Sequence, residues 1–246
     1  MSNNAEILSA KEVTVCFGGL VAVDHVDLHL NRGEIIGLIG ANGAGKTTLF
    51  NAITGFVQLT SGSITIDGKT YTKPVPHTMC KNGIGRTYQV CQPFGRQTAL
   101  QNVMVGAFLH HPRFYEARNL AEEILERLDL EKYRDTMGKD MSLIQLKRLE
   151  LARALATEPK VLLLDEVMAG LNNAECEEVM DIIRGIREQG ISIVVVEHVM
   201  KAVMGLSERI YVLNQGHLIA EGTPAEVSQN PDVIKSYLGE SKHVRH

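Results

Sequence analysis

The stretch Gly40-Ala41-Asn42-Gly43-Ala44-Gly45-Lys46-Thr47 decides the fold, because it matches G-x-x-x-x-G-K-[ST] at every fixed position. An apolar run, 34–39, precedes it, and a run without glycine or proline, 46–53, follows it. A glycine-rich loop between a strand and a helix turns backbone N–H groups toward phosphate oxygens, and the helix dipole adds to the attraction. The pattern therefore predicts a cradle for a nucleoside triphosphate within an α/β fold.

Several positions in and after this stretch are predicted to contact the nucleotide. Lys46 brings a full positive charge to the phosphates, and the hydroxyl of Thr47 is expected to bind Mg²⁺. The predicted nucleotide-binding residues of the cradle are Asn42, Gly43, Ala44, Gly45, Lys46, Thr47 and Thr48. A glycine-rich turn that merely opens a helix is the alternative, and the strand and helix patterns on either side disfavour it.

Length and composition indicate a globular chain. With 246 residues, 44% hydrophobic and 22% charged, we expect one domain over 1–246 that can carry a smaller subdomain. Apolar runs such as 161–164 fall far short of the ~20 residues that cross a bilayer. A net charge of -4 gives no broad attraction to nucleic acid, so no nucleic-acid partner is expected. Scattered cysteines, and the lack of a signal-peptide pattern at Met1 to Ala5, predict a cytoplasmic protein.

The N-terminal part alternates apolar and polar residues as half-buried strands do. The segments 7–15 and 21–30 show this pattern, and a further strand, 62–66, ends at the hairpin turn signal Asp67-Gly68. These segments predict an antiparallel β subdomain. From about 70 to 95 the chain is rich in Pro, Gly and polar residues, which predicts a surface connection without regular structure.

Helices and buried strands are predicted in the second part. Apolar residues recur at i, i+3, i+4 and i+7 along 117–128, and helical patterns dominate a stretch of about 97–156, the expected helical subdomain. The fully apolar run 161–164 and the run 191–196, which is apolar apart from Ser192, are typical of buried parallel strands. The core sheet is therefore expected to be mostly parallel, with a last hairpin at 210–220.

Charged residues follow both buried runs. Asp165 and Glu166 end the first, and Glu197 and His198 end the second. Because ligands bind at the carboxyl ends of strands in α/β sheets, these side chains are candidates for one cleft. Asp165 is expected to bind Mg²⁺ opposite Thr47, and Glu166 to orient or deprotonate the attacking water. Taken alone, such a strand-end pair is more often an ordinary solvated one.

The order of the signals along the chain resembles the nucleotide-binding subunits of ABC transporters. The shared signals are the cradle, Gln89, Ser142 with Gln145 before a basic helix, Asp165-Glu166 and His198. More narrowly, the chain resembles the LivG-type ATPase of branched-chain amino acid importers. The segments that carry this second resemblance are 17–20, 85–89, 102–103, 148–154, 168–172, 197–200, 211–216 and 237–240.

The resemblance implies a P-loop NTPase cassette with a RecA-like core, and it implies roles for individual residues. Phe17 would lie against the adenine, with Val23 as a second apolar contact, unless Phe17 is a plain core residue. Gln89 would contact Mg²⁺ or its water and report the nucleotide state to a membrane subunit. His198 would contact the γ-phosphate. Ser142 would cover the ATP held by a partner subunit. The implied catalytic residues are Glu166, His198 and Gln89; the implied metal ligands are Thr47, Gln89 and Asp165.

The chain departs from the family pattern in its signature. The usual L-S-G-G-Q reads Met141-Ser142-Leu143-Ile144-Gln145 here, without either glycine. If position 144 requires a positive φ, a β-branched residue is strained there by roughly 1–2 kcal/mol; if it requires space, Ile144 fills it. Val167 replaces a proline, which keeps an apolar contact, and Asn172 replaces an aspartate used across the dimer. These departures predict a weak donor to the partner's ATP, and hence a heterodimer rather than a homodimer.

The resemblance implies an ATP-hydrolysing, Mg²⁺-dependent subunit on the cytoplasmic face of a membrane. Its partners would be a second ABC ATPase, two permease subunits and, indirectly, a periplasmic or extracellular solute-binding protein. The expected cargo is a branched-chain or other hydrophobic amino acid. Alternatives are the ATPase of a urea importer or a lipopolysaccharide exporter, or a soluble ABC ATPase without a transport role. A GTPase is disfavoured because the sequence contains no N-K-x-D motif.

Overall fold

The computed structural model describes residues 5–240, without the side chains of 237–240. Its strands form a four-stranded sheet in the order β2-β1-β4-β5 and a six-stranded sheet in the order β10-β9-β3-β8-β7-β6. The α/β architecture with an antiparallel β part, predicted from the sequence, is confirmed. The signal-peptide prediction rests largely on residues 1–4, and part of the family resemblance on the side chains of 237–240, which lie outside the described residues.

The four-stranded sheet is the antiparallel part expected from the alternating segments. Its strands are β1 (Glu6–Phe17), β2 (Leu20–Asn31), β4 (Ser61–Ile66) and β5 (Lys69–Tyr71). β1 pairs antiparallel with both β2 and β4. The apolar side of β2 is buried at Val26, Leu28 and Leu30, as the alternation predicted.

The six-stranded sheet carries the cradle and the charged strand ends. Its strands are β3 (Ile35–Ile39), β6 (Ile84–Arg86), β7 (Val161–Asp165), β8 (Ser192–Val196), β9 (Arg209–Asn214) and β10 (His217–Gly222). Neighbouring strands from β6 to β9 run parallel, and β10 is antiparallel to β9. β3, β7 and β8 are buried at every residue, which explains their continuous apolar runs.

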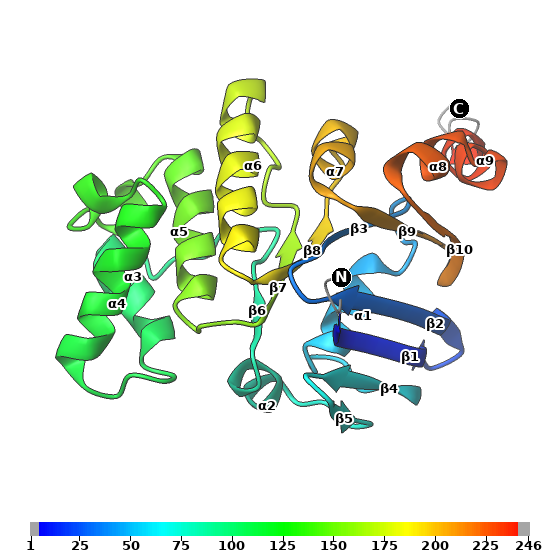
Figure 1. Ribbon diagram of the computed structural model, residues 1–246, viewed down its shortest axis with the longest axis horizontal. Coiled ribbons are helices and arrows are strands. Elements are labelled where there is room, and N and C mark those ends of the chain that lie inside the picture. The colour runs from blue at the N-terminus through cyan, green and yellow to red at the C-terminus, as the bar shows by residue number, and fades with distance from the viewer. Residues whose placement is uncertain (1–4, 241–246) are drawn as a thin grey trace.

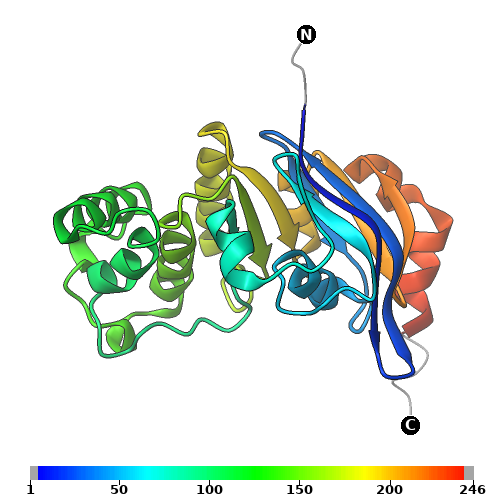
Figure 2. The same cartoon turned by 90° about the horizontal axis from the view of Figure 1, so that it is seen from below.

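Helices cover the core sheet and extend it at one end (Figure 1). They are α1 (Lys46–Ile53), α2 (Pro76–Lys81), α3 (Ala99–Ala107), α4 (Phe114–Arg127), α5 (Leu143–Leu155), α6 (Asn173–Glu188), α7 (Met200–Leu206), α8 (Pro224–Gln229) and α9 (Pro231–Glu240). Figure 2 shows α3, α4 and α5 grouped at the end of the molecule remote from the antiparallel sheet. In the described chain, no helix combines the length and the apolar character needed to cross a membrane.

Both faces of the core sheet are packed. On β7, Leu162 and Leu164 join a cluster with apolar residues of α3 to α6. Val161 and Leu163 point the other way, into a cluster with α1 and the antiparallel sheet. Side chains alternate across a strand, so one short strand serves two cores. The helices α3 to α5 thus share a continuous core with the sheet that carries the site.

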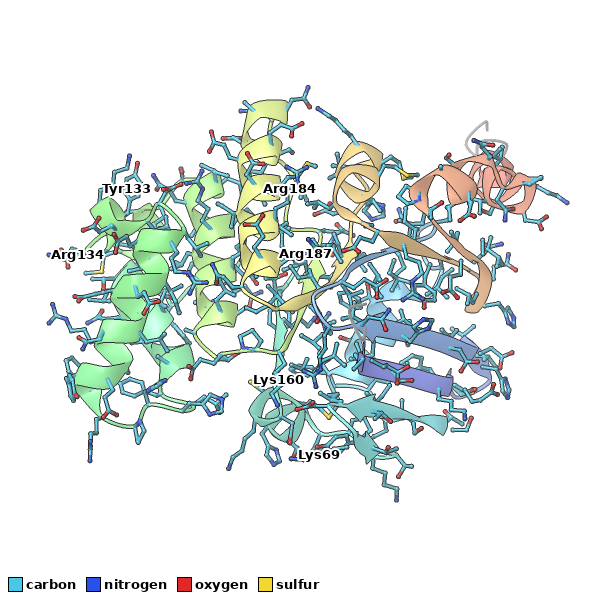
Figure 3. The ribbon with its side chains drawn as sticks, in the orientation of Figure 1. Lys69, Tyr133, Arg134, Lys160, Arg184 and Arg187 are labelled. Atoms are coloured by element: carbon cyan, nitrogen blue, oxygen red, sulfur yellow. The ribbon has the colours of Figure 1, made fainter. Side chains whose placement is uncertain are left out.

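The end of α6 is tied to the core sheet by a labelled side chain in Figure 3, Arg187. Its Nε donates to the Gly33 carbonyl at 2.7 Å, and its Nη2 pairs with Glu208 at 2.8 Å. Gly33 precedes β3 and Glu208 precedes β9. These contacts hold the end of α6 where two interior strands begin, at the end of the strands opposite the cradle.

The prediction of an irregular connection over 70–95 was wrong for its middle part. The structure places α2 there, followed by β6, which pairs in parallel with β7. β6 has only three residues, Ile84 to Arg86, too few to show a period. Its strand conformation is set by the ladder to β7. This missed strand delivers Arg86, and shortly after it Gln89, to the site.

Candidate nucleotide site

The cradle connects the buried strand β3 to α1, as the motif requires. Gly45 is the N-cap of α1 with φ 106°, and a Cβ there would lie 2.6 Å from the Ala22 carbonyl oxygen. Gly40 has φ 154°, and a Cβ would lie 2.2 Å from the Leu213 carbonyl oxygen. Glycine is required at both positions for backbone shape and close approach. The neighbouring strands therefore fix the loop in a form that leaves N–H groups at a helix N-terminus.

Lys46 begins α1 and lies over the loop that precedes it. The residue is 6% exposed, and its Nζ donates to the carbonyls of Gly40 at 2.6 Å and Ala41 at 3.0 Å. A buried ammonium needs such acceptors, because burying an unbonded charge is unfavourable. The arrangement places the cation within the cradle, at the helix end where an anion is favoured.

A cavity of about 600 Å³ lies beside the cradle and collects most of the predicted site. The predicted residues that line it are Phe17, Asn42, Gly43, Ala44, Gly45, Lys46, Thr47, Thr48, Gln89, Glu166 and His198. Phe17 is 50% exposed, so the alternative that it is a core residue was wrong. Val23 is buried and does not line the cavity, whereas the apolar residues Leu20 and Val21 do. The cavity thus has an apolar mouth and a polar end at the helix N-terminus.

The other two predicted catalytic side chains, those of Gln89 and His198, meet at Glu166. Gln89 Nε2 donates to Glu166 Oε2 at 2.6 Å, and His198 Nε2 lies 2.8 Å from Glu166 Oε1. The side chain of Glu166 is 15% exposed and that of His198 48% exposed. These residues come from the ends of β7 and β8 and from the segment after β6. Parallel strand ends bring them together across 109 residues of sequence, from position 89 to position 198.

The backbone of Glu166 is held in an unusual conformation. Its φ is 50°, in the left-handed region that side chains other than glycine disfavour. Its N–H donates to the Val196 carbonyl at 2.9 Å, and its own carbonyl accepts from Lys147 Nζ at 3.1 Å. Such strain persists where surrounding contacts over-determine it, and it aims the carboxylate at the cavity.

Asp165 is the last residue of β7, and its carboxylate faces a buried arginine. Arg86 Nη2 contacts Asp165 Oδ2 at 3.0 Å, with side chains 7% and 6% exposed. Arg86 Nη1 also donates to Asn51 Oδ1 at 2.6 Å. Asp165 does not line the cavity, unlike Glu166. The predicted metal ligand therefore lies behind the cavity wall, bound to an internal cation.

The oxygen donors near the cradle fit Mg²⁺ better than a transition metal. The Thr47 hydroxyl, the Gln89 amide and the nearby carboxylates are hard ligands. Across residues 5–236, no group of three or more His, Cys, Asp and Glu side chains could hold a metal. Mg²⁺ is commonly held by one or two protein oxygens together with substrate phosphates and waters. The donor set matches that mode of binding.

Ser142 lies apart from the cavity, at the N-terminus of α5. It is the N-cap, and its N–H donates to Gln145 Oε1 at 2.9 Å. Ile144 lies within α5, is not among the residues of positive φ, and packs partly against the core. Of the two alternatives for position 144, backbone strain does not apply, because the chain is helical there; the bulk of the side chain is the alternative that stays open. Leu143 is 46% exposed, so it extends into solvent beside Ser142.

Glu197, directly before His198, is a buried carboxyl that sequence reasoning left without a role. It is 3% exposed and accepts the Met168 N–H at 2.8 Å. Burial above all, and the nearby Glu166 charge, raise the pKa of Glu197 to about 7, although Lys147 and two backbone hydrogen bonds oppose the shift. The Glu197 contact fixes the turn that follows Glu166.

Sequence reasoning missed two buried cations of the site, Arg86 and Lys147. Arg86 is the last residue of β6, a strand too short to recognise from its sequence pattern. Lys147 falls on the same face of α5 as Leu151 and Ala154, at i, i+4 and i+7, and all three are buried. A charge on an otherwise apolar helical face was the available signal, since lysine is rarely buried without a partner.

Known protein families and relatives match this chain over most of its length. Residues 23–169 match the family described as "ABC transporter", and residues 217–243 match the "Branched-chain amino acid ATP-binding cassette transporter" family. The chain is 38% identical to BraF of Pseudomonas aeruginosa, a high-affinity branched-chain amino acid transport ATP-binding protein, over 96% of this chain and 98% of the relative. It is 40% identical to LivG of Salmonella typhimurium, with the same coverage. The lipopolysaccharide export ATP-binding protein LptB of Escherichia coli is 37% identical, over 95% and 97%.

Solved structures agree with the fold. The crystal structure of an ATP-binding cassette of an ABC transporter in its ADP conformation superposes with a TM-score of 0.87 at 30% identity, covering 96% of this chain and 99% of that one. A nucleotide-free cassette gives the same TM-score and identity. The fold class expected from the sequence is thereby confirmed. The chain belongs to the ABC transporter family and is one of its ATP-hydrolysing cassettes, coupled to transport.

Proposed function

We propose that the cavity binds ATP and that Glu166 activates the water that attacks the γ-phosphate. The observation that supports this most is the meeting of Gln89 and His198 on the two oxygens of Glu166, beside the cradle. A carboxylate held at the end of a strand can accept a proton from water or orient it. The donors of Gln89 and His198, which now contact Glu166, can instead bind oxygens of the phosphate or of water.

The remaining predicted residues would contact different parts of the nucleotide. Phe17 lies at the apolar mouth, where an adenine can stack. The cradle amides and Lys46 receive the phosphates at the start of α1. Mg²⁺, held by Thr47 and Gln89 with Asp165 behind them, would neutralise phosphate charge as it develops. For Asp165 to contact the metal, its carboxylate would have to release part of its pairing with Arg86.

The hydrolytic role of Glu166 is tested by Glu166→Gln in the chain purified with its copurifying subunits. We expect ATP turnover to fall by about a hundredfold or more, because an amide cannot accept the proton. Binding of ATP, measured by equilibrium binding, should remain. The matched control is Glu178→Gln on α6, which contacts Arg148 outside the cavity. Turnover that survives Glu166→Gln would refute the role.

The chain is proposed to dock on permease subunits through a groove of about 440 Å³ that lies beside the segment leading to Gln89. The groove lies between α2, α3, α5 and the end of α1. Its lining includes the exposed apolar side chains Phe56, Tyr88, Val105 and Leu109. An amphipathic helix fits such a groove through its apolar face. Tyr88 N–H donates to Glu150 Oε1 at 2.6 Å, which connects the groove to Gln89.

A second cassette is proposed to complete the site, because Ser142 lies outside the cavity that its own chain forms. We favour a related chain over a second copy. Leu143 and Ile144 replace both glycines of the signature, and their side chains hinder approach to the α5 N-terminus. Mass spectrometry of the purified complex tests this: two different cassettes are expected, and two copies of this chain would contradict the preference.

Branched-chain amino acids are the cargo that the comparisons favour. BraF and LivG bear that description, and the match at 217–243 points the same way. We propose that residues 1–246 act as one domain, with a helical subdomain at about 97–156. It would be held at the cytoplasmic face of the membrane by permeases that receive cargo from a solute-binding protein.

The cargo is tested with the complex in liposomes together with its solute-binding protein. Leucine, isoleucine or valine should stimulate ATP turnover, whereas urea and lipopolysaccharide should not. Stimulation by urea or lipopolysaccharide alone would favour one of the rival transporters.

A further inference from the structure

Lys147 is a buried cation that bonds to two backbone carbonyls of the site. It lies on α5, five residues after Ser142, and is 3% exposed. Its Nζ contacts the carbonyl of Gln89 at 3.3 Å and that of Glu166 at 3.1 Å. Removing an ammonium from water is unfavourable unless it is hydrogen-bonded. We therefore expect the bonds from Lys147 to these two carbonyls to hold them in place.

The two carbonyls belong to residues whose side chains also meet. Gln89 Nε2 donates to Glu166 Oε2 at 2.6 Å. Lys147 therefore closes a ring in which both backbones are bound to one ammonium and both side chains to each other. Through this ring, the distance between the Gln89 amide and the Glu166 carboxylate depends on the position of α5.

Lys147 also contributes to the left-handed backbone at Glu166. The N–H of Glu166 is anchored on β8, and its carbonyl is anchored by Lys147. Loss of the second anchor would allow the peptide after Glu166 to rotate toward an unstrained conformation. The carboxylate would then no longer be aimed at the same point.

The helix that carries Lys147 begins at the signature residue Ser142. We propose that Lys147 is a positioning residue that couples α5, and with it the signature offered to the partner's ATP, to Gln89 and Glu166 of its own site. The proposal rests on the proposed function, in which Glu166 and Gln89 act on ATP. A movement of α5 is thereby transmitted to the carboxylate without passing through the nucleotide.

The test uses the purified complex and three variants, Lys147→Met, Lys147→Arg and the control Arg148→Met. Arg148 is the next residue on α5, and its guanidinium contacts Glu178 and Asp129 rather than the site. We expect Lys147→Met to lower kcat by about tenfold or more, since small misplacement of a catalytic group has effects of that size. The KM for ATP should stay within about threefold. Lys147→Arg, which keeps a cation and several donors, should recover most of kcat.

A double-mutant cycle with Gln89→Ala separates positioning from general destabilisation. If Lys147 acts through Gln89 and Glu166, the effects of Lys147→Met and Gln89→Ala on kcat will be strongly non-additive. Arg148→Met combined with Gln89→Ala should be additive. Equal behaviour of Lys147→Met and Arg148→Met, or additivity in the first cycle, would overturn the proposal.

The outcome is distinguishable from failure of the proposed function. If the wild-type complex hydrolyses ATP and Glu166→Gln abolishes this, the function stands, whatever Lys147→Met does. If turnover does not depend on Glu166, the function itself fails. Should Lys147→Met not assemble, Lys147→Gln, which keeps one donor, replaces it and is judged by the same kcat, KM and cycle criteria.

Discussion

Asn172 and Glu175 cap the N-terminus of α6 reciprocally. The Glu175 N–H donates to Asn172 Oδ1 at 3.0 Å, and the Asn172 N–H donates to Glu175 Oε2 at 2.8 Å. The residue that departs from the family's aspartate is therefore a well-placed helix cap. Asparagine and aspartate are nearly equivalent in this role.

We expect Asn172→Ala to lower the free energy of unfolding by about 1 kcal/mol, because the cap is lost. Asn172→Asp should keep it within a few tenths, since a carboxylate also accepts the Glu175 N–H. Urea denaturation of the two variants measures the difference. Equal loss in both would show that the side-chain acceptor does not stabilise α6.

Arg86→Ala is expected to lower the free energy of unfolding by about 3 kcal/mol or more, because it leaves the Asp165 carboxylate buried and unpaired. The control is Arg113→Ala. Arg113 pairs with Glu116 at 3.1 Å on the surface, with 77% of its side chain exposed. That change should stay below about 1 kcal/mol. Urea denaturation measures both free energies of unfolding. A similar decrease in the two variants would contradict the idea that burial makes the Arg86–Asp165 pair costly to break.

The buried carboxyl of Glu197 is expected to make the stability of the fold depend on pH. Because burial raises its pKa to about 7 in the folded chain, the native state binds this proton more tightly than the unfolded state does. The stability from the protonated carboxyl is complete below the unfolded pKa, and it is lost as the pH rises toward about 7. Glu197→Gln should match wild type near pH 4, below the unfolded pKa, and exceed it by up to about 3 kcal/mol near pH 8.

Urea denaturation of Glu197→Gln and wild type at several pH values checks this trend. The exposed Glu126→Gln on α4 controls for amide replacement as such. A stability difference between Glu197→Gln and wild type that is independent of pH would rule out titration of this group.

Ile144→Gly should raise ATP turnover in the assembled complex if the side chain at position 144 limits the donated signature. The structure assigns the obstacle to bulk, because the backbone is helical there. Glycine also weakens α5 by roughly 1 kcal/mol, so the rise must outweigh that loss. Leu146→Gly, another partly buried α5 residue, controls for helix weakening and should not raise turnover. Unchanged turnover in Ile144→Gly would reject the idea.

The sequence predicted the cradle and its strand and helix because glycine and lysine are required there at fixed spacing. The buried strands β7 and β8 followed from their continuous apolar runs. The family resemblance implied a place for Gln89 in the site. The buried runs themselves predicted that Glu166 and His198 share a cleft, although only tertiary structure brings the three side chains within hydrogen-bonding distance. The ends of parallel strands made that inference possible.

What the sequence did not predict depends on contacts between distant segments. β6 is a strand because β7 pairs with it. The sequence could not exclude Phe17 as a core residue, and only its exposure in the folded chain shows that it is not one. The sequence left two alternatives at Ile144, backbone strain or filled space, and the helix Leu143–Leu155 decides against strain because it determines the backbone there.

Arg86 contacts two regions of the cassette at once. Its guanidinium pairs with Asp165 at the end of β7, and the same residue lines the groove beside α2 and α3. A charge brought into the groove therefore acts on the electrostatic environment of Asp165 through one shared cation. Competition for this single guanidinium would link the proposed docking groove to Asp165 without any rearrangement of the backbone.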